Sequence, residues 1–104
     1  MPHVPIFRSS MFEGHSKASL YVDVVEEINW SVGQIVNVLE ESSVAENTLV
    51  FFNSDNGPWL TYYDLGGSST PWHDGKITSM ERRFSRSWNL WWPDTSKPAV
   101  IDDI

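Results

Sequence analysis

The sequence contains no cysteine in its 104 residues. This absence excludes disulfide bonds, thiolate metal sites, a cysteine nucleophile and any cofactor formed from a cysteine side chain. Basic residues are few, with 7 Lys and Arg against 14 Asp and Glu, and the net charge of −7 argues against nucleic acid or an anionic membrane as a partner. No apolar run approaches the roughly 18 to 20 residues of a membrane span. The first residues also lack the pattern of a signal peptide, so the sequence gives no localisation.

Aromatic residues are abundant by contrast, with 6 Trp, 5 Phe and 3 Tyr, and most of them follow Phe51. A chain of this length forms one small domain with a modest core. Large aromatic side chains gain free energy when they are buried. We therefore expect the aromatic residues to form either that core or a contact surface.

A long helix is predicted over about residues 16–41, because apolar residues recur there at helical spacing. Ser16 is the expected N-cap, Ser42 and Ser43 end the pattern, and Gly33 is a weak point that costs about 1 kcal/mol relative to Ala. Asp23 and other polar residues are expected to lie largely off the apolar face. That face consists of Leu20, Val24, Ile28, Val32, Ile35, Val36 and Leu39.

Two strands are predicted after the helix. Residues 48–53 are β-branched and aromatic and are bounded by turn residues, which indicates a buried strand. A second strand is expected at about 89–92, ended by Pro93. A helix that leads into a strand through a short loop is half of an α/β unit, so the expected fold class is α/β, with the helix packed on a small sheet and residues 1–104 forming one partial domain.

Four short motifs in order carry a family resemblance. The chain resembles the type I sulfatases, the arylsulfatase-like members of the alkaline-phosphatase superfamily, and the resemblance implies a fragment of a sulfatase-type sandwich. Each motif alone is weak, but their order and spacing are specific. They are Pro2-His3-Val4-Pro5, the helix residues 23–28 with Ser31-Val32-Gly33, the strand end Ser54-Asp55-Asn56-Gly57-Pro58, and Gly75-Lys76-Ile77-Thr78.

The resemblance implies a partial active site. In the family, an Asp-Asn pair at this strand end binds Ca²⁺ or Mg²⁺, which maps to Asp55 and Asn56; such ions prefer oxygen ligands. The family's sulfate contacts map to His3 and Lys76, which would stabilise charge on the sulfuryl oxygens. Without the family, a turn stabilised by Asx-type hydrogen bonds and a solvated lysine explain the same residues. His15 and His73 match no family role and are expected at the surface.

The family's nucleophile is a formylglycine made from a Cys/Ser-x-Pro-x-Arg motif, and no such motif occurs in this sequence. The N-terminal Asp-Asp metal ligands of the family and the Lys and His that follow its nucleophile are also absent. We therefore expect no catalysis by these residues alone, no bound cofactor, and doubtful metal occupancy. The ends of the sequence fall inside the family's domain, so open sheet surface is expected to be covered by a homo-oligomer.

The segment from Arg82 to Leu90 departs from the family's Glu-Gly-Gly-x-Arg-x-Pro pattern. With a free choice of codons, a one-base shift converts it to Gly-Gly-Phe-Arg-Val-Pro-Gly-Ile, after which Trp91 and Trp92 continue in the original frame. We interpret this as a local, compensated frameshift in a gene descended from a sulfatase.

Three functional hypotheses follow from the sequence. The first is a non-catalytic, sulfatase-derived fragment that acts, if at all, as an oligomeric binding or structural protein. The second is the C-terminal part of a split, Ca²⁺- or Mg²⁺-dependent sulfatase, whose partner chain supplies the nucleophile. The third is a carbohydrate-binding module in which Trp59, Trp72 and Trp91 stack on sugars.

Overall fold

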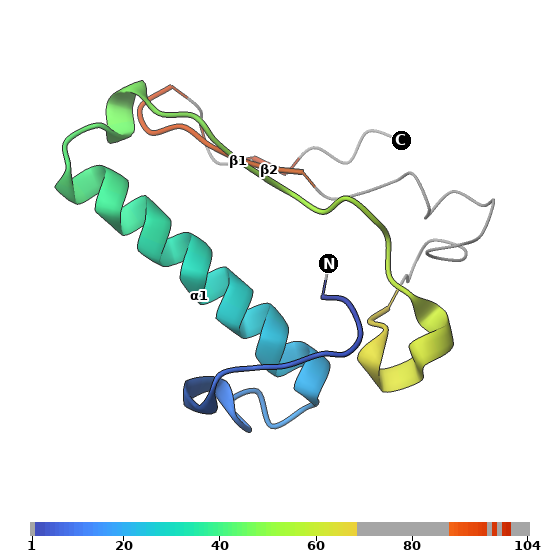
Figure 1. Cartoon of the computed structure of the whole chain (residues 1–104). Helices are drawn as coiled ribbons and strands as arrows, with labels where there is room; N and C mark the ends of the chain where they lie inside the picture. The colour runs from blue at the N-terminus through green and yellow to red at the C-terminus, as the bar shows by residue number, and fades with distance from the viewer. Residues whose placement is uncertain (1, 69–87, 96, 98, 101–104) are drawn as a thin grey trace.

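The computed structural model describes residues 2–68, 88–95, 97 and 99–100 (Figure 1). Within these residues, three short 3-10 elements accompany one long helix and two strands. In chain order these are η1 (Ser10–Phe12), α1 (Leu20–Glu41), η2 (Ala45–Asn47), β1 (Val50–Asn53), η3 (Leu60–Leu65) and β2 (Trp88–Trp91). No helix in this described part is long and apolar enough to cross a membrane.

The predicted helix is confirmed, but its predicted start is wrong. Helix α1 begins at Leu20, and its N-cap is Ser19, whose Oγ accepts a hydrogen bond from the backbone N–H of Val22 at 3.3 Å. Ser16 is not the cap, because its hydroxyl donates to Asp23 Oδ1 at 2.7 Å instead. The C-terminal boundary agrees with the prediction, since Ser42 is the C-cap.

Strands β1 and β2 pair as a two-stranded antiparallel sheet, with Val50 opposite Trp91 and Asn53 opposite Trp88. Both predicted strands are present with shifted bounds. Strand β1 starts late because Thr48 still belongs to the end of η2, where its hydroxyl donates to the Val44 carbonyl oxygen at 2.8 Å. The last three residues of the segment that departs from the family, 88–90, lie in β2, whereas 82–87 fall outside the described residues.

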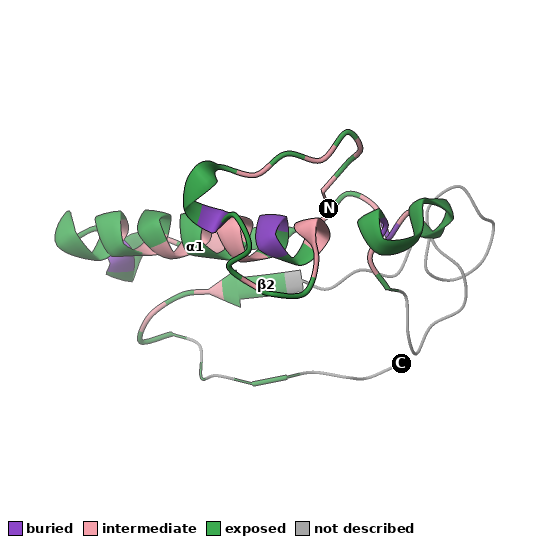
Figure 2. Ribbon diagram, turned by 90° about the horizontal axis from the view of Figure 1, so that it is seen from below, coloured by how far each residue is buried: buried purple, intermediate pink, exposed green. Residues whose placement is uncertain are grey.

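The prediction that the first strand is buried is wrong. Phe51 and Phe52 on β1 remain 46 % and 41 % exposed, because the described sheet has only two strands and no layer covers it. The described core lies instead where the N-terminal segment crosses α1 (Figure 2), and it includes Phe12 and Val24.

Helix α1 packs against η1, η2 and η3, whereas an open groove of about 560 Å³ separates its remaining apolar face from the sheet. Figure 1 shows α1 and the two strands as separate elements on either side of this space. The expected α/β composition is therefore present, with helix and sheet facing one another across the groove.

Candidate functional site

The loop after β1 is the candidate site that the sequence indicated. Asp55 is exposed and Asn56 is half-buried, while Gly57 and Pro58 behind them are buried. The amide nitrogen of Asn56 donates a hydrogen bond to Asp55 Oδ2, and Ser54 Oγ donates to the backbone carbonyl oxygen of Asn56 at 2.9 Å. These are the contacts of a polar turn at a strand end, in which the two expected ligand side chains bond to each other.

The N-terminal Pro-His-Val-Pro segment lies beside this loop. The ring of His3 is 5.0 Å from the ring of Trp59, and Trp59 in turn meets Tyr62 edge-on at 4.7 Å. His3 Nδ1 donates to the Val4 carbonyl oxygen at 2.8 Å, because a carbonyl oxygen can only accept. The structure thus brings His3 next to the turn that contains Asp55 and Asn56, although more than fifty residues separate them in the sequence.

Residues 59–66 form a loop whose two ends lie close together and are joined by a backbone hydrogen bond. The N–H of Trp59 donates to the carbonyl oxygen of Gly66 at 3.1 Å. A Cβ atom on Gly66 would overlap the Trp59 carbonyl oxygen, so this position requires glycine. The closed segment positions the Trp59 ring against His3.

Three other residues named from the sequence, Lys76, His73 and Trp72, lie outside the described residues. Trp59 packs against His3 and Tyr62, whereas Trp91 lines the groove between α1 and the sheet.

The strand-end pair does not fit a divalent metal site by itself. Ca²⁺ requires about six to eight oxygen ligands, and Mg²⁺ about six. Asp55 and Asn56 supply at most a few oxygens, and one Asp55 oxygen already accepts the Asn56 amide. Within residues 2–68, 88–95, 97 and 99–100, no group of three or more His, Asp or Glu side chains could hold a metal ion.

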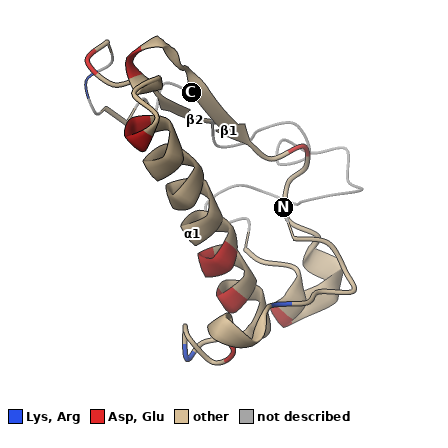
Figure 3. Cartoon of the chain, turned by 60° about the vertical axis from the view of Figure 1, so that its left-hand side comes forward, with Lys and Arg blue, Asp and Glu red and all other residues tan. Residues whose placement is uncertain are grey.

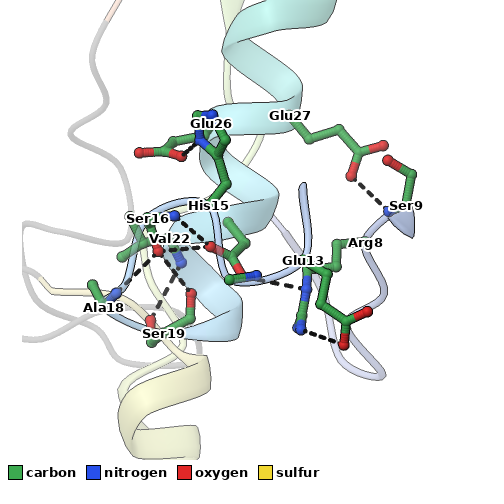
Figure 4. A network of polar contacts seen from close by, with 12 residues as sticks. Arg8, Ser9, Glu13, His15, Ser16, Ala18, Ser19, Val22, Glu26 and Glu27 are labelled. Carbon is green, nitrogen blue, oxygen red and sulfur yellow. Dashed lines mark hydrogen bonds and ion pairs between the residues drawn. The ribbon is translucent and has the colours of Figure 1, made fainter. Parts of the chain in front are cut away.

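A second polar cluster, at the start of α1, was not predicted as a unit (Figure 4). Its centre is the buried carboxylate of Asp23, which is 3 % exposed. Asp23 Oδ2 accepts from the N–H of Gly14 at 3.0 Å and lies 3.2 Å from Arg8 Nε, while Oδ1 accepts from the N–H of Ser16 at 2.9 Å and from its hydroxyl. One carboxylate thereby ties residues 8–16 to the helix.

These donors all stabilise the ionised form of Asp23. The hydroxyl of Ser16, followed by the backbone N–H groups of Ser16 and Gly14 and the Arg8 guanidinium, holds the pKa of the Asp23 carboxyl below its ordinary value of 3.8, and burial opposes this only in part. Asp23 therefore carries its charge throughout the neutral range, close to the N-terminal end of α1, where negative charge is favourable.

Two further acidic side chains of α1 hold the same N-terminal segment. Glu27 Oε2 accepts from the backbone N–H of Ser9 at 2.9 Å, and Glu26 Oε2 accepts from His15 Nδ1. His15 is a surface residue as expected, with its side chain 62 % exposed. The sequence signal for this cluster was an acidic residue in the first turn preceded by Gly and Ser donors, but spacing alone did not show that the loop folds back onto the helix.

The geometry defines an α/β fragment in which a strand ends in an Asp-Asn turn beside a histidine from the beginning of the sequence. A family model, Sulfatase, matches residues 3–103 of this chain. The chain therefore belongs to the sulfatase family. This finding confirms the resemblance drawn from the four motifs.

Three curated relatives of this chain are longer than it is. The chain is 41 % identical over 92 residues to N-acetylgalactosamine-6-sulfatase of Homo sapiens, which covers 88 % of this chain and 18 % of that protein. It is 34 % identical over 102 residues to the arylsulfatase of Hemicentrotus pulcherrimus, covering 98 % of this chain and 18 % of that protein. Steryl-sulfatase of Homo sapiens is 38 % identical over 96 residues, covering 88 % and 16 %. No solved structure gives a significant match.

The coverage shows that these 104 residues correspond to less than a fifth of the curated relatives that they match. They match one portion of the length of these sulfatases.

Proposed function

We propose that these residues alone do not hydrolyse sulfate esters, and that any role they have comes from association, as an oligomeric binding or structural protein. The observation that carries the proposal is the strand-end turn. Asp55 and Asn56, the inherited metal-ligand pair, bond to each other and supply too few oxygens for Ca²⁺ or Mg²⁺. The sequence also lacks the Cys/Ser-x-Pro-x-Arg motif that supplies the nucleophile in the family.

Turnover of an aryl sulfate tests this proposal directly. The purified chain is incubated with 4-nitrophenyl sulfate in the presence of Ca²⁺ or Mg²⁺, and release of nitrophenol is followed by absorbance. We expect the rate of the buffer blank, because a site without its nucleophile retains little catalysis. Turnover that disappears in Asp55→Ala but persists in the surface variant Glu40→Ala would contradict the proposal.

Calcium titration calorimetry provides a second readout. We expect no saturable heat from the chain, since one carboxylate and one amide form a weak site for a hard cation. A saturable signal that Asp55→Asn removes would show that the inherited pair still binds metal.

The second candidate function is that of one part of a split sulfatase. The contact between His3 and Trp59 favours it, because Trp59 directly follows the turn of residues 54–58, so His3 lies near the loop that carries two other residues mapped from the family's active site. Here the chain would supply Asp55, Asn56, His3 and Lys76, and another polypeptide would supply the nucleophile and the remaining metal ligands. Its test is to mix the chain with the separately produced remainder of a related sulfatase and Ca²⁺: activity that Asp55→Ala abolishes would favour this candidate over the first.

The frameshift hypothesis is tested by the DNA itself. Codons 81–91 must permit the one-base shift that restores Gly-Gly-Phe-Arg-Val-Pro-Gly-Ile, and codons incompatible with that shift would rule the hypothesis out.

A further inference from the structure

We propose that Tyr21 and Asp23, in the first turn of α1, are the positioning residues that hold His3 against Trp59 at the candidate site. Each of the two residues anchors one of the two segments that meet there. Any part that the contact plays in catalysis rests on the second candidate function, that of one part of a split sulfatase, whereas the contact itself does not depend on it.

Asp23 anchors the N-terminal segment. Its carboxylate accepts the N–H groups of Gly14 and Ser16 at 3.0 and 2.9 Å. Arg8 Nε lies 3.2 Å from Asp23 Oδ2, and this charged pair fixes the guanidinium next to the helix. Arg8 comes five positions after His3, and five residues span at most about 18 Å. An anchored Arg8 therefore confines His3 to the surroundings of the start of α1.

Tyr21 anchors the other segment, the loop of residues 59–66 that begins with Trp59. Its ring lies against Gly67, which directly follows this loop: a Cβ atom added to Gly67 would come within 2.7 Å of the Tyr21 hydroxyl oxygen and 2.8 Å of the ring carbon Cζ. Burial raises the pKa of the Tyr21 hydroxyl above its ordinary value of 10.0, in agreement with a packed ring. The end of the loop is therefore placed by the first turn of α1.

Helical geometry explains how one turn can hold both segments. Tyr21 and Asp23 are two residues apart, which is about 200° around the helix, so their side chains leave α1 on different sides. Figure 1 shows the N-terminal segment crossing the start of α1 between η3 and η1. Figure 3 shows a basic residue on this segment close to acidic residues of the helix. The start of α1 thus lies between the two segments that it holds.

The two anchored segments meet at the contact between His3 and Trp59. The centroids of the two rings are 5.0 Å apart, and their planes are inclined by 60°. Pro2 and Pro58, the sequence neighbours of the two rings, line the groove together with Tyr21. Because more than fifty residues separate the two rings in the sequence, their relative position depends on the anchors rather than on the local chain. When either anchor is removed, one ring loses its fixed position relative to the other.

NMR spectroscopy of the full 104-residue chain tests both anchors, at a pH above about 8, where histidine side chains are neutral. The Trp59 ring displaces the imidazole proton signals of His3 from their positions in an unstructured chain. His3→Gln identifies these signals, and Trp59→Leu measures the displacement. We expect Asp23→Asn and Tyr21→Ala each to lose most of it, because each variant releases one of the two segments.

A signal from another part of the chain separates loss of positioning from loss of folding. The indole N–H of Trp92 donates to the Glu46 carbonyl oxygen at 3.1 Å, and its signal should stay in place in both variants. General unfolding would move this signal together with that of His3, and circular dichroism checks that α1 is retained. If Asp23→Asn does not fold, Ser16→Ala removes only the hydroxyl donor at 2.7 Å and should lose a smaller part of the displacement.

Val22→Ala is the matched control for Tyr21→Ala. Val22 is 36 % exposed and points about 100° away from Tyr21 around the helix, so its variant should leave the His3 signals unchanged. In a chain that already carries Trp59→Leu, Asp23→Asn should no longer move the His3 signals, because its effect requires the contact.

Three results would overturn the proposal. The first is an unchanged displacement of the His3 signals in either Asp23→Asn or Tyr21→Ala. The second is an equal loss in Val22→Ala, and the third is an effect of Asp23→Asn that persists in full without the Trp59 ring. The signals report the contact whether or not the chain hydrolyses an ester, so failure of this proposal and failure of the proposed function are separate results.

Discussion

The two faces of α1 are covered in different ways. On one face, residues 8–16 fold back over the helix and are held by directional bonds to Asp23, Glu26 and Glu27, and Phe12 is buried beneath them. On the other face, an apolar stripe of the helix faces the uncovered sheet across the groove. A few charge-assisted hydrogen bonds can fix a short segment locally. The side chains of an apolar stripe are buried only when a large apolar area covers them, and that area has to come from another layer of structure.

On the face of α1 that residues 8–16 cover, removal of the Phe12 side chain should have the largest effect on stability. The side chain is 5 % exposed, and its ring lies 5.9 Å from that of Trp30 and 5.5 Å from that of His15. We expect Phe12→Ala to lower the free energy of unfolding by about 3 to 5 kcal/mol, measured by urea titration with tryptophan fluorescence. Phe7 is 79 % exposed, so Phe7→Ala should change it by less than about 0.5 kcal/mol. Equal losses would show that Phe12 is not the buried contact on this face of α1.

Neutralisation of Asp23 should have the next largest effect. Asp23→Asn keeps one oxygen acceptor but turns an amide N–H₂ towards groups that are themselves donors, so the urea midpoint should fall, by less than in Phe12→Ala. Glu41→Gln, at the exposed end of the helix, is the control and should leave the midpoint nearly unchanged.

The same residue predicts a pH dependence. Because the folded-state pKa of Asp23 lies below its ordinary value of 3.8, its contribution to stability is present above that ordinary value and is lost as pH falls through the lower folded-state pKa. Urea midpoints measured from neutral pH into this acidic range should therefore decline more steeply for the original chain than for Asp23→Asn. Parallel curves for the two proteins would contradict this role.

Loss of the helix cap should be smaller again. Ser19→Ala removes the acceptor for the Val22 N–H and should cost about 1 kcal/mol in thermal unfolding followed by circular dichroism. Ser31 provides the comparison within α1, since its hydroxyl donates only to the Glu27 carbonyl of the same helix. Ser31→Ala should be neutral or slightly stabilising, because Ala is the better helix former.

A substitution of Gly33 should have the smallest effect, and with the opposite sign. Apart from the adjacent residues and the helix's own backbone, no atom of the described residues lies within 4 Å of a Cβ added at Gly33, so Gly33→Ala should stabilise the chain by about 0.5 to 1 kcal/mol. Gly66→Ala is the contrasting variant and should destabilise it, since the added Cβ would overlap the Trp59 carbonyl oxygen. The same thermal unfolding experiment separates the two, and a loss of stability in Gly33→Ala would contradict the open space described at this position.

Much of the local structure could be predicted from sequence. The 3.6-residue repeat of apolar side chains specifies α1, and the β-branched and aromatic run ending at Asn53 specifies β1. The start of α1 was missed because Ser16 and Ser19 are equally good caps by residue type. The choice between them depends on Asp23, because its carboxylate accepts a hydrogen bond from the Ser16 hydroxyl.

The candidate site was predictable as a position but not as an arrangement. The positions of Asp55 and Asn56 could be predicted because the two residues come at the end of a strand, where a turn is indicated. The order of the motifs assigned His3 to the same active site through the family resemblance. The hydrogen bond between Asp55 and Asn56 and the packing of His3 on Trp59 are contacts that spacing does not encode. Lys76 stays a prediction, since it lies outside the described residues.

The sequence by itself determined the type of each main element and the family, because helix periodicity, strand composition and motif order are local properties of the chain. The tertiary structure decided that Asp23 is buried, that Ser19 caps the helix, that β1 is uncovered, and that an apolar groove separates α1 from the sheet. These outcomes depend on how segments distant in sequence approach one another. That approach is set by long-range burial and by competition among hydrogen-bond partners, which no window of neighbouring residues contains.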